Sequence, residues 1–142
     1  MNTVHQHFRS GYGLPAALIL GVMLLSACAK DDPGSPRSDI PVNITFDETN
    51  CPTAVDPNNP QVDKASNQRL AWQAVDTAGK SINEGFTIYF DTFKGGQLKA
   101  NSKGFRKSPK FDPDTPVNVE YKYTIVGERC PAEPLDPRFF LN

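Results

Sequence analysis

Three cysteines have the most readily defined chemistry in this chain of 142 residues, and they lie far apart at Cys28, Cys51 and Cys130. A disulfide uses cysteines in pairs, so an odd number leaves one sulfur for another reaction. Cys51 and Cys130 each precede a proline, which favours extended backbone at both positions. We expect these two to form a disulfide if the chain is exported to an oxidising compartment. Two buried free thiols are the alternative.

Carboxylates could supply acid–base chemistry, as in glycoside hydrolases, where two carboxyl groups flank the bond that is cut. The candidates are Asp47, Glu48, Asp91, Asp112, Asp114 and Glu120. No spacing in the sequence selects a pair. Asp112 and Asp114 lie in a proline-rich stretch, where aspartate commonly forms local turn hydrogen bonds. Turn formation is therefore the favoured interpretation.

Histidine chemistry is missing from most of the chain, because both histidines, His5 and His7, lie among the first ten residues. Without histidine, the later residues cannot build a blue-copper site or a Ser-His-Asp triad. Zinc sites made of histidine and cysteine are likewise excluded there. We predict no catalytic residue, no metal site and no cofactor.

Calcium needs only oxygen ligands, and one stretch is rich in them. The donors are Asp56, Asn58, Asn59 and Asp63. The EF-hand pattern fails at Pro60 and Gln61. A looser calcium site is the alternative to a simple Asn/Pro turn, which we favour.

Residues 93–111 have the most unusual local composition, with six cations, three phenylalanines and no acid. The cations are Lys94, Lys99, Lys103, Arg106, Lys107 and Lys110. They could bind an anionic partner, such as a phosphorylated glycolipid, a cell-wall polymer or an acidic protein. Alternatively, the lysines protect an edge strand from pairing with other chains. The structural interpretation is favoured, and the binding interpretation stays open.

The N-terminal segment, residues 1–27, predicts a secretory signal peptide. Arg9 is its one basic residue, residues 14–25 are apolar, and the small residues Ser26 and Ala27 follow. The apolar run has about 12 residues, whereas a transmembrane helix needs about 20.

Residues 25–28, Leu-Ser-Ala-Cys, resemble the lipobox of bacterial lipoproteins. The resemblance implies that a diacylglyceryl group is attached to the sulfur of Cys28, that the chain is cut before Cys28, and that the new amine is acylated. Several acyl chains would anchor the protein firmly in a membrane. Because Ala29 and not aspartate follows Cys28, the resemblance implies an outer-membrane lipoprotein of the bacterial cell envelope, facing the periplasm. An ordinary secretory signal is the alternative.

Residues 28–41 are polar and rich in proline, which predicts a flexible tether. The remaining residues, 42–142, would form one domain. Without the signal peptide the chain has 14 Lys and Arg (15 less Arg9) against 16 Asp and Glu. This slightly acidic balance argues against nucleic-acid binding.

Alternation of apolar and polar residues with a period of two dominates the rest of the chain. It predicts strands over 40–46, 69–75, 86–90, 117–125 and 135–141, with weaker strands over 52–55, 60–63 and 97–100. Turn-forming residues lie between them, and no stretch has a sustained helical pattern. We therefore expect an all-β fold, an antiparallel β-sandwich of about seven strands.

The order Cys51, Trp72, Cys130 resembles that of immunoglobulin domains, although Glu128 stands where their tyrosine is expected, two residues before the second cysteine. The resemblance implies an Ig-like or cupredoxin-like sandwich and not a true immunoglobulin domain. Several short segments also resemble small secreted bacterial sandwiches that carry no known activity. These segments are 55–57, 70–72, 86–90, 121–125 and 135–137.

Together these features predict a lipid-anchored envelope protein that acts as a non-catalytic binding or assembly module. Its contacts would be the membrane, through the lipid at Cys28, and an anionic envelope component or another envelope protein. One alternative is a carboxylate-dependent hydrolase of cell-wall or polysaccharide substrates. The other is a purely structural envelope lipoprotein.

Overall fold

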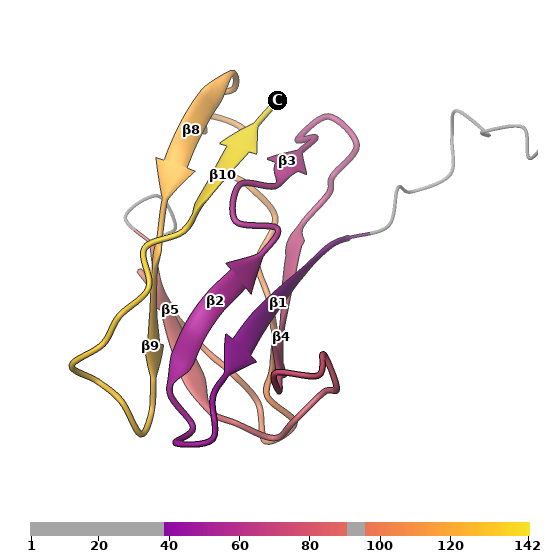
Figure 1. Ribbon diagram of the computed structural model, residues 1–142. Helices are drawn as coiled ribbons and strands as arrows, with labels where there is room; N and C mark the ends of the chain where they lie inside the picture. The colour runs from indigo at the N-terminus through magenta and orange to yellow at the C-terminus, as the bar shows by residue number, and fades with distance from the viewer. Residues whose placement is uncertain (1–38, 91–95) are drawn as a thin grey trace, which may run out of the picture. The chain divides into compact units, whose positions relative to one another are not determined.

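The computed structural model describes residues 39–90 and 96–142, and it shows an all-β fold in that part of the chain (Figure 1). Those residues contain no helix that is long and apolar enough to cross a membrane. The expected all-β class is confirmed. The predictions for the signal peptide, Cys28, most of the tether, Asp91 and Lys94 lie outside the described residues.

The largest sheet, here called sheet A, has four strands in the order β2-β1-β4-β7. Their bounds are β1 (Ile40–Phe46), β2 (Pro52–Asp56), β4 (Leu70–Val75) and β7 (Phe105–Lys107). β1 runs antiparallel to β2 but parallel to β4, and β4 runs antiparallel to β7. β2 and β7 are therefore the outer strands, and they run in the same direction.

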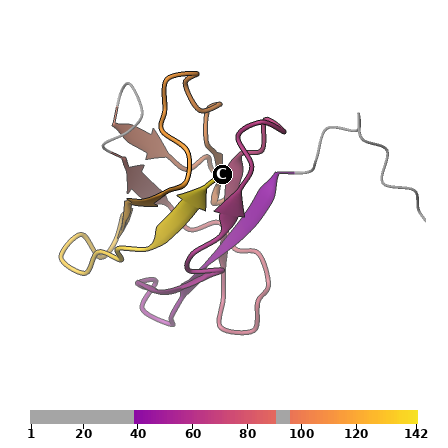
Figure 2. The same cartoon turned by 90° about the horizontal axis from the view of Figure 1, so that it is seen from above.

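Two three-stranded sheets complete the described fold. Sheet B has the order β3-β10-β8, with bounds β3 (Gln61–Val62), β10 (Arg138–Leu141) and β8 (Val119–Lys122). Sheet C has the order β6-β5-β9, with bounds β6 (Gln97–Lys99), β5 (Phe86–Tyr89) and β9 (Thr124–Gly127). β10 pairs in parallel with β3 and antiparallel with β8, and all pairs in sheet C are antiparallel. From above, β10 (yellow) lies near the centre of the view, with β1 (purple) to one side (Figure 2).

One hydrophobic core receives side chains from all three sheets. The predicted alternation is confirmed in β1, where Val42, Ile44 and Phe46 are buried. Trp72 of β4 lies at the centre, with its ring 5.5 Å from Phe90 and 5.7 Å from Tyr123. Such tilted and edge-on contacts are the favourable arrangements for aromatic rings.

The expected number of strands and the expected direction of their pairing were both wrong. The described residues form ten strands and not about seven, and the pairs β1–β4 and β3–β10 are parallel where an antiparallel sandwich was expected. Alternation reports which face of a strand is buried but carries no information about the direction of its neighbour.

The predicted strand 117–125 is also different, because it divides at Tyr123 into β8 and β9, which belong to different sheets. Tyr123 donates its backbone N–H to the carbonyl of Pro137, and its side chain stays in the core. Val117 and Val119, expected on the buried face, are 44% and 38% exposed. Val119 is the first residue of β8 and Val117 precedes the strand, so both lie outside the part that packs on the core.

The two sides of the fold are closed by different devices. On one side, residues 100–104 carry the chain from β6, at the edge of sheet C, to β7, at the edge of sheet A. Gly104 makes this crossing with φ +63°, and a Cβ there would lie 2.5 Å from the carbonyl oxygen of Ile82. On the other side, a disulfide between Cys51 and Cys130 joins the start of β2 to the end of β9.

Candidate functional site

The cationic segment 93–111 is not one loop, because it contains both β6 and β7. Two of its cations are neutralised by neighbouring acids. The Nζ of Lys99 lies 2.9 Å from the carboxylate of Glu128. Lys107 contacts the carboxylate of Asp39, whose Oδ1 also lies 3.3 Å from Nε of Arg69. The hydrogen bond from Lys107 and the nearby positive charges lower the pKa of Asp39.

The other described cations of the segment remain available. Lys103, Arg106 and Lys110 are exposed, and no carboxylate of the described residues lies within 4.0 Å of them. Lys103 lies at the tip of the turn that joins β6 to β7, Arg106 lies on β7, and Lys110 follows it. We call these three side chains the cationic edge, since they follow the outer strand of sheet A.

Edge protection explains part of the positive charge. The outward-facing backbone groups of an edge strand can pair with another chain, and lysine side chains discourage this. Lys99 and Lys107 lie on edge strands and are each held by an acid. Lys103, Arg106 and Lys110 have no such partner among the described residues, so edge protection alone does not explain why these three charges lack a neighbouring acid.

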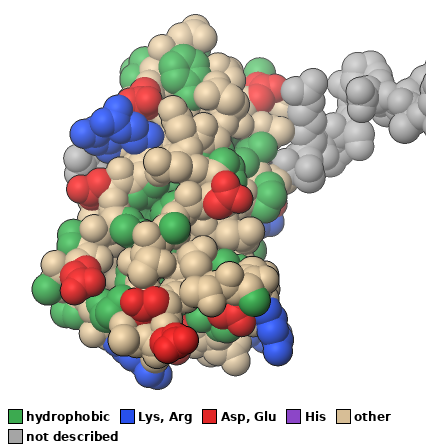
Figure 3. Space-filling view, in the orientation of Figure 1, with side chains coloured by type: hydrophobic (Ala, Val, Ile, Leu, Met, Phe, Trp, Pro, Cys, Tyr) green, Lys and Arg blue, Asp and Glu red, His purple; other side chains and the backbone are tan. Residues whose placement is uncertain are grey.

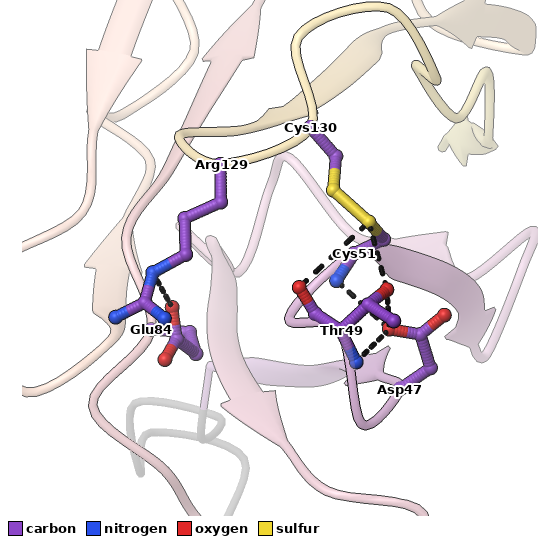
Figure 4. A network of polar contacts seen from close by, with 6 residues as sticks. All are labelled: Asp47, Thr49, Cys51, Glu84, Arg129 and Cys130. Carbon is purple, nitrogen blue, oxygen red and sulfur yellow. Dashed lines mark hydrogen bonds and ion pairs between the residues drawn. A yellow bond between two sulfur atoms is a disulfide. The ribbon is translucent and has the colours of Figure 1, made fainter.

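The disulfide has its own polar surroundings (Figure 4). Asp47 accepts hydrogen bonds at Oδ1 from the backbone N–H groups of Thr49 and Cys51 and from the hydroxyl of Thr49. These bonds, the hydroxyl bond first, lower the pKa of Asp47. Nearby, Nε of Arg129 lies 3.5 Å from the carboxylate of Glu84. The hydrogen bonds accepted by Asp47 shape the turn between β1 and β2, so Asp47 acts as a turn residue.

Asp112 and Asp114 are the candidate carboxylates that lie beside a hollow, which has a volume of about 440 Å³. Thr115, Pro116, Val119 and Tyr121 also line it. Its wall is held in place by Lys64, which donates to the carbonyls of Pro113 and Thr115, both at 2.6 Å. Both acids are exposed to solvent. The turn expected here is present, since the N–H of Thr115 donates to the carbonyl of Asp112.

Two of the remaining oxygen-bearing candidates, Glu120 and Asp63, are engaged elsewhere. Glu120 pairs with Arg138 and accepts a bond from the amide of Asn59. Asp63 accepts hydrogen bonds from the N–H and hydroxyl of Ser66. Within residues 39–90 and 96–142, no group of three or more His, Cys, Asp or Glu is arranged to hold a metal.

Sequence reasoning missed a second hollow, which opens along the outer strand β2. It has a volume of about 370 Å³. Its lining consists of Thr53, Ala54, Val55, Asn58, Leu135, Asp136 and Pro137. None of the five acids of residues 38–63 lines this hollow, so the local composition does not mark it. The approach of residues 135–137 to β2 depends on the tertiary fold and could not be read from the sequence.

Comparison with known proteins gives little more. No family model matches the sequence, and no curated protein matches it. Among solved structures, the chain is similar to the N-terminal domain of phage TP901-1 ORF48, with a TM-score of 0.42 and 10% sequence identity. The match covers 74% of this chain and 98% of that chain. A similarity at this level carries no argument about function.

Proposed function

We propose that this protein is an exported, lipid-anchored module of the bacterial envelope that binds an anionic partner and catalyses no reaction. Its domain would be an Ig-like or cupredoxin-like sandwich, which is supported by sheets that enclose one core and by the disulfide between Cys51 and Cys130. The predicted signal peptide, residues 1–27, and the lipobox-like residues 25–28 support export and anchoring.

One observation carries the binding proposal: the cationic edge is exposed and lacks neutralising acids. Charges of one sign on a surface attract oppositely charged partners over about a Debye length, roughly 8 Å at physiological salt. Binding would therefore weaken as salt is added. The backbone of Arg106 is held in place because Arg106 of β7 is paired with Trp72 of β4, which is fully buried in the core.

The binding proposal can be tested in cells with a photo-crosslinking residue in place of Ser102, which is exposed beside Lys103. We expect a covalent adduct with an anionic molecule. The adduct should be lost when Lys103→Glu and Arg106→Glu are combined. The matched control is Lys80→Glu with Lys122→Glu, which changes the net charge equally at exposed lysines outside the segment. No adduct, or equal loss in both variants, would refute the proposal.

Anchoring is tested separately at Cys28. A Cys28→Ser chain should take up no labelled palmitate and should leave the membrane fraction. The unchanged chain and a Cys51→Ser, Cys130→Ser chain serve as controls and should both be labelled. Labelling of the Cys28→Ser chain would contradict lipidation at this residue.

A further inference from the structure

We propose that the anionic partner is a second copy of this chain: the β7 edge of one copy docks against the β2 edge of the next. This inference rests on the proposed function, since it names the partner of the cationic edge. It is carried by the opposite charges and the free backbone groups of the two outer strands of sheet A.

The charges of the two outer strands are complementary. Among the described residues, the cations of the cationic edge, Lys103, Arg106 and Lys110, lie along β7 with no acid within 4.0 Å, whereas residues 40–62, which contain β2, hold three acids and no Lys or Arg. Glu48 and Asp56 flank or end β2, and both are exposed. Asp136 adds a further carboxylate at the hollow beside this strand. Figure 3 shows acidic side chains over the region of β2 and the loop that follows β9.

The backbone of β2 has pairing groups to offer. The N–H of Ile40 donates to the C=O of Arg69. The backbone N–H and C=O groups of the even-numbered residues of β1 therefore face β4, and those of the odd-numbered residues face β2. Asn43 is opposite Asp56, and Thr45 is opposite Ala54. The N–H and C=O groups of Val55 must then face away from β1, towards the hollow, while Thr53 is the extra residue where the register shifts between Thr45 and Phe46.

The outer edge of β7 is shorter. The C=O of Gly104 accepts a hydrogen bond from the N–H of Ala74, and the N–H of Ser108 donates to the C=O of Leu70. The backbone N–H and C=O groups of the even-numbered residues of β7 therefore face β4. The N–H of Phe105 donates to the side-chain oxygen of Asn101, and the C=O of Phe105 accepts a hydrogen bond from the backbone N–H of Asn101. Lys107 therefore presents the free backbone groups of β7, between the exposed side chains of Arg106 and Lys110.

These edges select a head-to-tail arrangement. Two β7 edges repel each other, as do two β2 edges, so a twofold dimer through either edge is disfavoured. A β7 edge and a β2 edge attract, and the hollow beside β2 has room for a long side chain such as that of Arg106. Because β2 and β7 run in the same direction, copies added without inversion would pair these strands in parallel. Such a contact repeats and generates a row of copies.

The test places the photo-crosslinking residue at Thr53 in the full chain, expressed in cells. We expect adducts at multiples of the mass of the chain, with the crosslinked peptide of the second copy drawn from residues 103–110. Combining Lys103→Glu with Arg106→Glu should lower the yield about tenfold, the effect of losing two exposed ion pairs. Asp56→Asn with Asp136→Asn should also lower it, and this pair keeps an acceptor oxygen for the hydroxyl of Thr124.

The control is again Lys80→Glu with Lys122→Glu, which should leave the yield unchanged. The inference is overturned if Thr53 captures nothing, captures another molecule, or captures a different part of the second copy. If Ser102 still captures an anionic molecule in that case, the binding proposal stands and only the identity of the partner is wrong. If Ser102 also captures nothing, both fail.

Discussion

Tyr123 is the residue that links the three sheets. Its position ends β8 and precedes β9, so its backbone belongs to the boundary between sheets B and C. Its hydroxyl accepts a hydrogen bond of 3.3 Å from Nε1 of Trp72, which extends from sheet A. Burial raises the pKa of Tyr123 to about 12, while the bond from Trp72 acts in the opposite direction.

Replacing Tyr123 with phenylalanine should lower the free energy of unfolding by about 1–2 kcal/mol, because the buried N–H of Trp72 would lose its acceptor. Urea-induced unfolding measures this loss. Tyr89→Phe is the matched control, since Tyr89 is 44% exposed and should be nearly neutral. Equal effects of the two substitutions would contradict the role assigned to the hydroxyl.

At the residue scale, the sequence predicts some functional contacts better than others. The pairing of Cys51 with Cys130 follows from counting cysteines, because two candidates remain once Cys28 is assigned to the lipobox-like residues. The split of the six cations into paired and unpaired groups does not follow. Lys107 meets Asp39 only because β1, β4 and β7 lie side by side, and that order depends on long-range packing.

At the element scale, the crossing from β6 to β7 depends on Gly104. Alanine at this position would combine an unfavourable positive φ with a contact of 2.5 Å to the carbonyl oxygen of Ile82. We expect Gly104→Ala to cost more than about 2 kcal/mol. Gly79→Ala is the control, because Gly79 has φ +79° but nothing lies within 4 Å of its Cβ position, and it should cost only about 1 kcal/mol. Urea unfolding of the two variants compares them directly.

The opposite side of the fold depends on the disulfide. Its cysteines are 79 residues apart, and closing a loop of that length contributes about 4.5 kcal/mol in the chain-entropy model. The Cys51→Ala, Cys130→Ala chain should lose stability of that order in urea. Reductant should destabilise the unchanged chain and leave the variant as it was. A reductant effect on the variant would show that another process is being measured.

Strands were predicted correctly where large apolar side chains alternate clearly with other residues along the strand. β1, β4 and β5 each place large apolar side chains in the core, and their patterns are clear. β7 was missed because it is short, lies at an edge and carries charged residues, so it lacks an apolar face. The division of the predicted strand 117–125 was missed because apolar side chains continue to alternate through Tyr123. The change is in the neighbouring strand, since β8 pairs with β10 whereas β9 pairs with β5.

At the scale of the whole molecule, the ionisable groups predict a stability profile with three regions. The pKa values of Asp39 and Asp47 are lowered on folding from 3.8, so their contribution is present above the unfolded value and is lost as pH falls through the folded values. Between about pH 6 and 8 no histidine titrates, since residues 8–142 contain none. Above about pH 10 the raised pKa of Tyr123 makes its ionisation favour unfolding.

Urea unfolding between pH 3 and 11 checks this profile. We expect stability to rise with pH in the acid region, to change by less than about 0.5 kcal/mol between pH 6 and 8, and to fall above pH 10. The Tyr123→Phe chain should lose part of the alkaline fall. A steep change near pH 6.5 would contradict the profile, because no described side chain accounts for it.

The central position of β10 determines when the fold can be completed. β3 and β8 do not pair with each other, and each depends on β10, which lies between them. β3 and β10 are separated by about 80 residues in the chain, and pairings between distant segments form slowly. While the chain is being synthesised, sheet B cannot form until residues 138–141 have emerged. Until then Val62, which is buried in the finished core, has no sheet to join, which gives chaperones a defined interval in which to bind.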